Sequence, residues 1–409
     1  MEPTDELRYM LYLTGCAALG RKAQPPPHRI DWDETLSLAR RHRLQWFVAF
    51  ALKISGNLGC PGELRARTLD ELYRAAGENC LQRQKLTDFL EELEAAGFSC
   101  AVLKGFAAAL NYAAPDCRIG GDVDLWIDPE KEDAALNWLR GRGCAIEEPD
   151  GTSHHSLVRH PELAWVEFHR MLYAARMVEV WGLDGPNRVT RPCEPLVRCR
   201  DGFLTLGPTD HLLFITMHSV KHFVMLTFGL RMILDVAVIH RALSGSADMG
   251  RYWSVVRGAR CETFVRTLLG IGQEYFGISA TTEVNADPEE MRLVLESSDE
   301  RYSDPAVRLS VVEAYRCARH TEAHGSVWYR AAYLRSFLPA AFVSKAQMTG
   351  KYPVLEKRPW LLPFLQLHRL ATRGTAIAIR VLRGKAMAGD RADAAVNART
   401  ELYRRLGMI

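Results

Sequence analysis

The chain has 409 residues, of which 48% are hydrophobic and 25% are charged, a balance typical of globular proteins and not of disordered ones. Its formal net charge of +3 is small for this length, which excludes a protein that binds nucleic acid or membranes over its whole surface. The length predicts two or three domains.

Targeting signals and cysteine usage both indicate the cytoplasm. The N-terminus, MEPTDELRYMLYLTGCAALG, has acidic residues where a secretory signal needs basic ones, and no apolar run approaches the ~20 residues of a membrane span. The ten cysteines form no C-x-x-C pair, which fits reduced thiols better than a disulfide framework or a structural zinc site. We therefore expect a cytoplasmic protein without a transmembrane segment.

In chain order, residues 1–98 are expected to form an N-terminal helical region. Apolar residues recur at helical intervals in DWDETLSLARRHRLQWFVAFALK (31–53). A later stripe of Leu86, Phe89, Leu90 and Leu93 stops at Gly97, and this stripe predicts a helix that packs on another element.

The helical spacing of apolar residues ends near residue 99, and short strand-like segments follow. SCAVLKG and VDLWID read as strands with the helix-like FAAALNYAA between them, and Asp128 and Pro129 predict the start of a helix over EKEDAALNWLRGRG. CAIEE, HHSLVRH and AWVEFHRML alternate well enough to be three more strands. Residues 99–172 therefore predict a small mixed sheet, in an α+β fold with helical regions on both sides of this core.

Residues 173–208 are expected to be a linker that contains a hairpin around Asp201 and Gly202, and residues 209–409 a C-terminal helical domain. Thr209 is the expected N-cap of the strongest helical segment, 209–243. The segment 357–385 holds seven Lys or Arg and no acid. We interpret it as a cationic amphipathic surface helix, with an anionic partner such as RNA, a peptide leader or a lipid surface as the alternative.

Two acids stand at alternate positions in RIGGDVDLWID (118–128). Residues two apart on a strand point the same way, so Asp122 and Asp124 can converge on one patch. Two carboxylates this close raise each other's pKa unless a cation is present, and a pair of Mg²⁺ ions suits such acids for in-line displacement at phosphorus. Gly120 and Gly121 would let a phosphate approach the backbone closely. An exposed pair on an edge strand is the plain alternative.

Two further segments favour a phosphate site. In VLKGFAAAL a strand runs into Lys104 and Gly105 and then a helix, so backbone N–H groups and one positive charge can face phosphate oxygens. Glu167 stands among apolar neighbours in AWVEFHRML, where a buried acid is unfavourable unless it is paired or liganded. It is a candidate third metal ligand or general base. A snorkelling Lys104 and a salt bridge from Glu167 to Arg170 are the alternatives.

Histidines near these acids are further candidates. His169 shares a strand face with Glu167 and can touch a phosphate, hydrogen-bond the acid or be structural. His154 and His155 would point to opposite sides of a strand, so we expect at most one of them at the site.

One helix face in the C-terminal region also carries polar groups. The spacing of His218, Lys221 and His222 is i, i+3 and i+4, so the three side chains share one helix face. This face can close over a nucleotide or acceptor. The alternative is a solvent-exposed edge or a packing contact to the α/β core. Arg231 and Asp235, at i and i+4, are expected to pair with each other.

The segments LKGFAAALNYAAPDCRIGGDVDLWI and HHSLVRHPELAWVEFHRML together resemble the bacterial "uncharacterised nucleotidyltransferase" family of the DNA polymerase beta-like nucleotidyltransferase superfamily. Looser likeness on both sides extends the resemblance over most of the chain. It implies that Asp122 and Asp124 bind two Mg²⁺ ions, with Glu167 as the third acid. It also implies that Lys104 and Gly105 form the phosphate-binding turn and that Arg118 lies beside the triphosphate.

The chain departs from the superfamily pattern in two places. Phe106 follows Gly105, where most members have Gly-Ser or Gly-Gly, so no hydroxyl is available to hold a phosphate. The spacing from Gly105 to Asp122 is also longer than the usual loop.

Together the residues and the resemblance predict a Mg²⁺-dependent nucleotidyltransferase, with Mn²⁺ as an alternative ion, which moves an NMP from an NTP to an acceptor and releases pyrophosphate. ATP is the expected nucleotide. Its expected contacts are Lys104, Gly105, Arg118, Gly120, Gly121, His169, His218, Lys221 and His222. The acceptor stays open among a peptide or secondary-metabolite intermediate, another small molecule, a protein side chain and an RNA end. A non-catalytic nucleotide- or partner-binding module on this fold and a related phosphotransferase are the alternatives.

Overall fold

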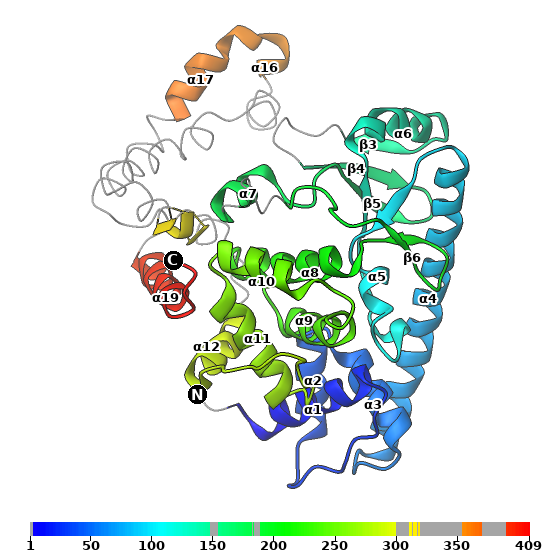
Figure 1. Cartoon of the computed structure of the whole chain (residues 1–409), viewed down its shortest axis with the longest axis vertical. Coiled ribbons are helices and arrows are strands. Elements are labelled where there is room, and N and C mark those ends of the chain that lie inside the picture. The colour runs from blue at the N-terminus through cyan, green and yellow to red at the C-terminus, as the bar shows by residue number, and fades with distance from the viewer. Residues whose placement is uncertain are drawn as a thin grey trace. The chain divides into compact units, whose positions relative to one another are not determined.

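The computed structural model describes residues 3–147, 154–181, 183, 189–299, 311–312, 314–316, 318–319, 354–369 and 390–409. The chain forms two compact units (Figure 1). The first comprises Met1–His222 and Phe228–Glu300, and the second comprises Phe223–Thr227 and Arg301–Ile409. The candidate site lies entirely within the first unit.

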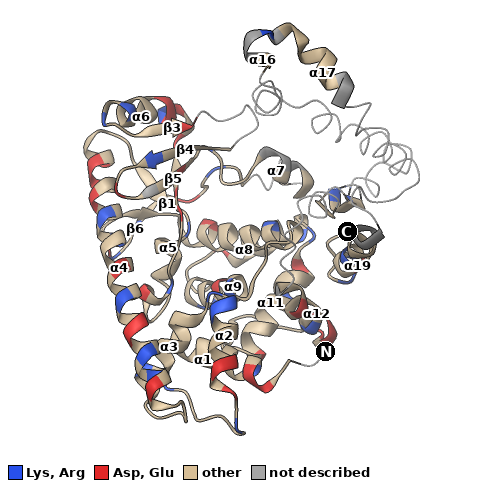
Figure 2. Cartoon of the chain, turned by 180° about the vertical axis from the view of Figure 1, so that it is seen from behind, with Lys and Arg blue, Asp and Glu red and all other residues tan. Residues whose placement is uncertain are grey.

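Four helices begin the first unit: α1 (Asp5–Ala18), α2 (Trp32–Arg41), α3 (Gln45–Ser55) and α4 (Gly62–Ala95). The Thr4 hydroxyl accepts a hydrogen bond from the Leu7 amide, and the Asp31 carboxylate accepts from the first-turn amides of α2, which satisfies amides that would otherwise lack partners. α1 packs against α2 and α3. The surface of α4 carries acidic and basic residues along its length (Figure 2), and its apolar stripe near the C-terminal end is buried.

A mixed seven-stranded sheet forms the centre of the first unit, in the order β3-β4-β5-β2-β1-β7-β6. β2 pairs in parallel with β5, and β1 with β7; the other neighbours are antiparallel. This confirms the expected mixed sheet with helices on either side. The strands are β1 (Cys100–Val102), β2 (Val123–Ile127), β3 (Ala145–Glu147), β4 (His155–His160), β5 (Ala164–His169), β6 (Val197–Arg198) and β7 (Leu204–Thr205). The β6–β7 hairpin turns at Gly202, with φ 92°, and extends the sheet beyond β1.

The two faces of this sheet differ in chemistry. Val123, Leu125 and Ile127 of β2 join the hydrophobic core, together with Val166 and Phe168 of β5. The buried stripe of α4 and apolar residues of α6 (Pro129–Gly141) cover that face. Because side chains alternate along a strand, the intervening acids of β2 and β5 point to the opposite face.

One helix, α7 (Ala175–Trp181), lies between β5 and β6. Five more follow the last strand: α8 (Pro208–Val224), α9 (Leu230–Leu243), α10 (Met249–Gly258), α11 (Glu262–Glu274) and α12 (Pro288–Asp299). The expected helical segment 209–243 is thus two helices, with Leu226 at φ 55° between them. Thr209 is not the cap, because α8 already begins at Pro208; its hydroxyl instead accepts a hydrogen bond from the Asp248 amide.

The second unit contains α16 (Val354–Lys357), the short 3-10 turn η2 (Pro359–Leu361), α17 (Leu362–Arg369) and α19 (Asp390–Arg405). Arg399 of α19 lies 4.2 Å from the centre of the Phe223 ring. Lys357, Arg358 and Arg369 of the expected basic segment are described, whereas its other four cations lie outside the described residues. Among the described helices, none is both long and apolar enough to cross a membrane.

Candidate active site

Strand register brings two distant acids together. Asp124 of β2 and Glu167 of β5 are direct partners in the parallel pair, on the face opposite the core. The Asp124 side chain is 1% exposed and that of Glu167 is 25% exposed. Asp122, just before β2, is 49% exposed. β2 and β5 therefore place a buried acid beside a half-buried acid, and an exposed acid lies just before β2.

His169 links the two strand acids. Its Nε2 atom lies 3.1 Å from Asp124 Oδ1 and 3.2 Å from Glu167 Oε2, so its N–H donates to carboxylates that can only accept. Burial disfavours the imidazolium, but the two hydrogen bonds outweigh burial and raise the pKa of His169. The hydrogen bond from His169 in turn lowers the pKa of Glu167, so Glu167 is ionised near neutral pH.

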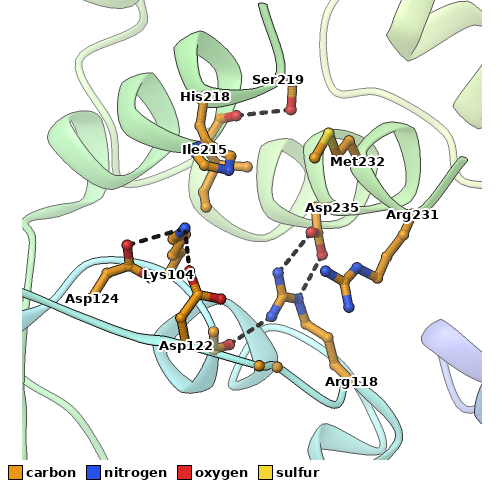
Figure 3. A pocket seen from close by; sticks show the side chains of 13 residues that line it. Lys104, Arg118, Asp122, Asp124, Ile215, His218, Ser219, Arg231, Met232 and Asp235 are labelled. Atoms are coloured by element: carbon orange, nitrogen blue, oxygen red, sulfur yellow. Dashed lines mark hydrogen bonds and ion pairs between the residues drawn. The ribbon is translucent and has the colours of Figure 1, made fainter. Parts of the chain in front are cut away.

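Lys104 lies between the aspartates (Figure 3). Its Nζ is 3.0 Å from Asp124 Oδ1 and 3.4 Å from Asp122 Oδ2. Burial opposes its charge, but Asp124 and Asp122 outweigh burial and raise the pKa of Lys104. The ammonium thus supplies the positive charge that two neighbouring carboxylates need.

A glycine turn adjoins these charges. Gly105 has φ 59° and ψ −111°, a conformation that residues with a Cβ rarely adopt. Gly120 approaches it so closely that a Cβ at position 120 would lie 3.7 Å from the Gly105 Cα. The following helix, α5 (Phe106–Ala109), has only four residues, which is shorter than expected and leaves little helix dipole. Side-chain cations therefore supply most of the positive potential here.

Arg118 stabilises this turn through the Gly105 carbonyl. Its Nη1 donates to the Gly105 carbonyl at 2.9 Å, and its Nε and Nη2 donate to the two carboxylate oxygens of Asp235 in α9, each at 2.7 Å. The Tyr112 hydroxyl donates to Asp235 at 2.6 Å. Arg118 borders the pocket as expected, but its guanidinium is only 5% exposed and is engaged by Asp235. The geometry makes it a brace for the turn.

The expected Arg231–Asp235 pair is wrong. Asp235 is held by Arg118, and Arg231 instead donates to the Ile119 carbonyl at 2.8 Å. Helix spacing permits a pair between positions i and i+4. The planar guanidinium of Arg118, from the loop that faces α9, instead gives Asp235 two parallel hydrogen bonds. Both arginines consequently connect α9 to the 118–121 loop.

α8 presents three polar side chains to the carboxylates. His218, Lys221 and His222 line the same cavity as Asp124 and Glu167. Burial and the nearby Lys104 charge lower the pKa of Lys221 and of His218, and burial with the Lys221 charge lowers that of His222 to about 4. Both imidazoles are therefore neutral at pH 7.

His154 and His155 both line this cavity, which corrects the expectation that at most one would. β4 begins at His155, so His154 lies before the strand and strand alternation does not govern it. The two ring centroids are 4.6 Å apart, and each is 5.2 Å from that of His169.

Two cavities meet at the carboxylates and share Lys104, Asp122, Asp124 and His218. The first, of about 60 Å³, is lined by the glycine turn and by Arg118, Arg231 and Asp235 (Figure 3). The second, of about 210 Å³, is lined by histidines from the sheet and from α8 and by an apolar wall. That wall comprises Leu172, Tyr173, Met177, Trp181 and Phe214. All the residues that the sequence proposed for the site border one of these cavities.

The sequence did not identify Asp235 as part of the site, nor the aromatic wall. Asp235 could have been found as Glu167 was, since it is a lone acid in the apolar run ILDVAVIH. The wall left no signal, because its apolar residues come from separate stretches before α7, in α7 and in α8, and none of these stretches differs in pattern from an ordinary core segment.

The acids fit a divalent cation. Asp124 Oδ2 is buried and accepts no hydrogen bond from any described residue. Asp124 and Glu167 offer carboxylate oxygens within 4.8 Å of each other, beside His169. A buried, unsatisfied carboxylate oxygen is unfavourable, and a cation would satisfy it.

Comparison with known proteins matches residues 28–277 to a family described as "Uncharacterised nucleotidyltransferase". No curated protein and no solved structure matches the chain. The matched residues contain the whole sheet, both cavities and every site residue described above. Since the match also spans more than half of the chain, this protein belongs to the uncharacterised nucleotidyltransferase family and is a transferase of nucleotidyl groups.

Proposed function

We propose that the protein is a Mg²⁺-dependent enzyme that transfers a nucleoside monophosphate, from ATP in the first instance, to an acceptor nucleophile with release of pyrophosphate. The observation that carries this proposal is the direct pairing of Asp124 with Glu167 across β2 and β5, beside Asp122 and Lys104. Acids from separate strands that share one cavity wall with a lysine are suited to holding a cation against a polyphosphate.

In this proposal Asp122, Asp124 and Glu167 would hold the divalent cation. When bound, such an ion neutralises charge on the phosphates and activates the attacking group. The low pKa of Glu167 makes it a weak base and favours a ligand role over proton abstraction.

The glycine turn would receive the phosphates. Gly105, Gly120 and Gly121 leave the backbone bare of side chains, so phosphate oxygens can approach it. Lys104 would then exchange its aspartate partners for phosphate, and Arg118 would keep the turn in place through the Gly105 carbonyl. These groups stabilise negative charge that builds up during transfer.

The second cavity would receive the acceptor. Its apolar wall can bury the body of a small molecule, or the tip of a peptide side chain, next to the carboxylates. The imidazoles of His218 and His222 are neutral near pH 7, so each can accept a hydrogen bond from the acceptor hydroxyl or amine and orient it. The nine described cysteines form no disulfide. The reaction would take place in the cytoplasm, where thiols stay reduced.

The test uses the purified chain, Mg²⁺, a fractionated lysate as the source of acceptor, and ATP labelled at either the α or the γ phosphorus. Nucleotidyl transfer puts the α label on an acceptor and releases pyrophosphate, and we expect Asp124→Asn to abolish it while the surface variant Asp133→Asn retains it. Transfer of the γ label with formation of ADP would identify a phosphotransferase instead. ATP binding without transfer of either label in any fraction would identify a non-catalytic nucleotide-binding module.

A further inference from the structure

Three imidazoles converge where β4 begins and β5 ends, beside the carboxylates. His155 and His169 are direct partners in the antiparallel β4–β5 pair, and His154 immediately precedes β4. Each of the three offers a ring nitrogen within 4.8 Å of the other two. Spacing of this order is what a single small cation requires of its ligands.

His169 is already oriented as a metal ligand would be. Its Nε2 donates to Asp124 and Glu167, while its Nδ1 is buried and has no hydrogen-bond partner among the described residues. Histidines that bind metals usually donate their other ring N–H to a carboxylate, which fixes the ring and raises its basicity. A buried ring nitrogen without a partner is costly, and coordination would remove that cost.

The donor type distinguishes this group from the carboxylate site. Mg²⁺ binds oxygen ligands and keeps much of its water, whereas imidazole nitrogens suit Zn²⁺ and other later transition metals. Lys221 in the same cavity adds positive charge that opposes any cation. Asp124 and Glu167, which lie 3.1 and 3.2 Å from His169 Nε2, add negative charge that favours one.

We propose that His154, His155 and His169 form a binding site for a transition-metal ion of the Zn²⁺ class, separate from the carboxylate site for Mg²⁺. Three protein ligands leave a coordination position open, as in sites where a zinc ion also binds a substrate group. The site borders the cavity that holds the apolar wall, so the open position is accessible to an acceptor.

The experiment measures Zn²⁺ binding without any turnover, so it stands apart from the test of nucleotidyl transfer. The full chain is stripped with EDTA and titrated with Zn²⁺ against a chromophoric chelator, in millimolar Mg²⁺. We expect one Zn²⁺ per chain, bound at least about 10-fold more weakly in His154→Ala and in His155→Ala. The control His28→Ala, at an exposed histidine outside the cavity, should bind as the wild type does.

Two further readouts keep the proposal falsifiable if a variant folds poorly. Zn²⁺ should raise the midpoint of thermal unfolding of the wild type but not of the His154 and His155 variants, and Asp122→Asn should retain Zn²⁺. The proposal is overturned if the wild type binds no Zn²⁺, or if His154→Ala and His155→Ala bind it like the wild type. Loss of the ion in Asp122→Asn alone would also overturn it, by assigning the ion to the carboxylates.

Discussion

Lys104 illustrates how one side chain can serve two states of the same site. Its ammonium lies within 3.4 Å of both aspartates, which is where the positive charge of a bound cation would also be needed. The ion pair therefore stabilises the carboxylates, and in the proposed reaction it would compete with the metal for the same oxygens. Phosphate groups that arrive with the metal would give the ammonium a new partner.

Replacing Lys104 tests this competition. We expect Lys104→Gln to bind Mn²⁺ several-fold more tightly in the absence of nucleotide, because the competing ammonium is gone, and to transfer nucleotide at least about 100-fold more slowly. Isothermal titration with Mn²⁺ and the labelled-ATP assay measure the two effects, with Lys131→Gln on α6 as the control. Weaker Mn²⁺ binding in the variant would contradict the competition.

Glu167 can be tested with a neutral residue of the same shape. Glu167→Gln keeps the size of the side chain but removes the charge that a divalent cation needs, so we expect transfer to fall at least about 100-fold. Glu162→Gln, in the exposed turn before β5, is the matched control and should keep wild-type activity. If both variants were equally active, Glu167 would have no role in the reaction.

At the scale of elements, the Arg118–Asp235 pair connects the glycine turn to helix α9. The two residues are 117 positions apart and both are buried. Removing one partner of a buried pair leaves an uncompensated charge, which costs far more than replacing both with apolar groups. The turn that would receive the phosphates thus depends on a helix outside the sheet.

A double-mutant comparison separates the stability of this pair from its effect on the site. We expect Asp235→Leu to lower the free energy of unfolding by about 3–5 kcal/mol, and the double variant Arg118→Met with Asp235→Leu to recover most of that loss. Urea unfolding measures both. In the double variant the Gly105 carbonyl has lost its Arg118 donor, so KM for the nucleotide should rise even though the fold is stable. An unchanged KM would show that the brace does not affect nucleotide binding.

At the scale of the whole molecule, buried histidines make stability depend on pH. Burial lowers the pKa of His240 in α9 to about 4, well below the value of about 6.5 in an unfolded chain. As pH falls below 6.5, the unfolded chain takes up a proton that the folded protein does not take up until about pH 4. The folded state therefore loses stability over this window.

A variant without the His240 imidazole should lose less stability than the wild type when the pH is lowered. When the pH falls from 7 to 5, we expect the free energy of unfolding to decrease less in His240→Leu than in the wild type, by up to about 2 kcal/mol. Urea unfolding at the two pH values measures this difference, and His28→Leu, at an exposed position, should behave like the wild type. Equal losses in the wild type and His240→Leu would show that His240 titrates normally in the folded protein.

Local features of this protein were accessible from short stretches of sequence. The alternation of Asp124 with Val123 and Leu125 predicted which side chains share a face, and Asp128 with Pro129 predicted the start of α6. The spacing of His218, Lys221 and His222 placed them on one side of α8. Each of these features depends on the chain's own periodicity over a few residues, which backbone geometry alone sets.

The sequence by itself determined the mixed sheet with its helices, the face of β2 to which Asp124 points and the glycine turn beside it. Asp122, which was expected on the same strand, lies just before β2. Only the tertiary structure decided that β5 lies next to β2, so that Glu167 meets Asp124, and that the partner of Arg118 is Asp235. It also decided that His154 and His155 join His169. Periodicity describes which way a side chain points, whereas the partner it meets depends on the packing of segments more than a hundred residues apart, and that packing minimises the free energy of the whole unit.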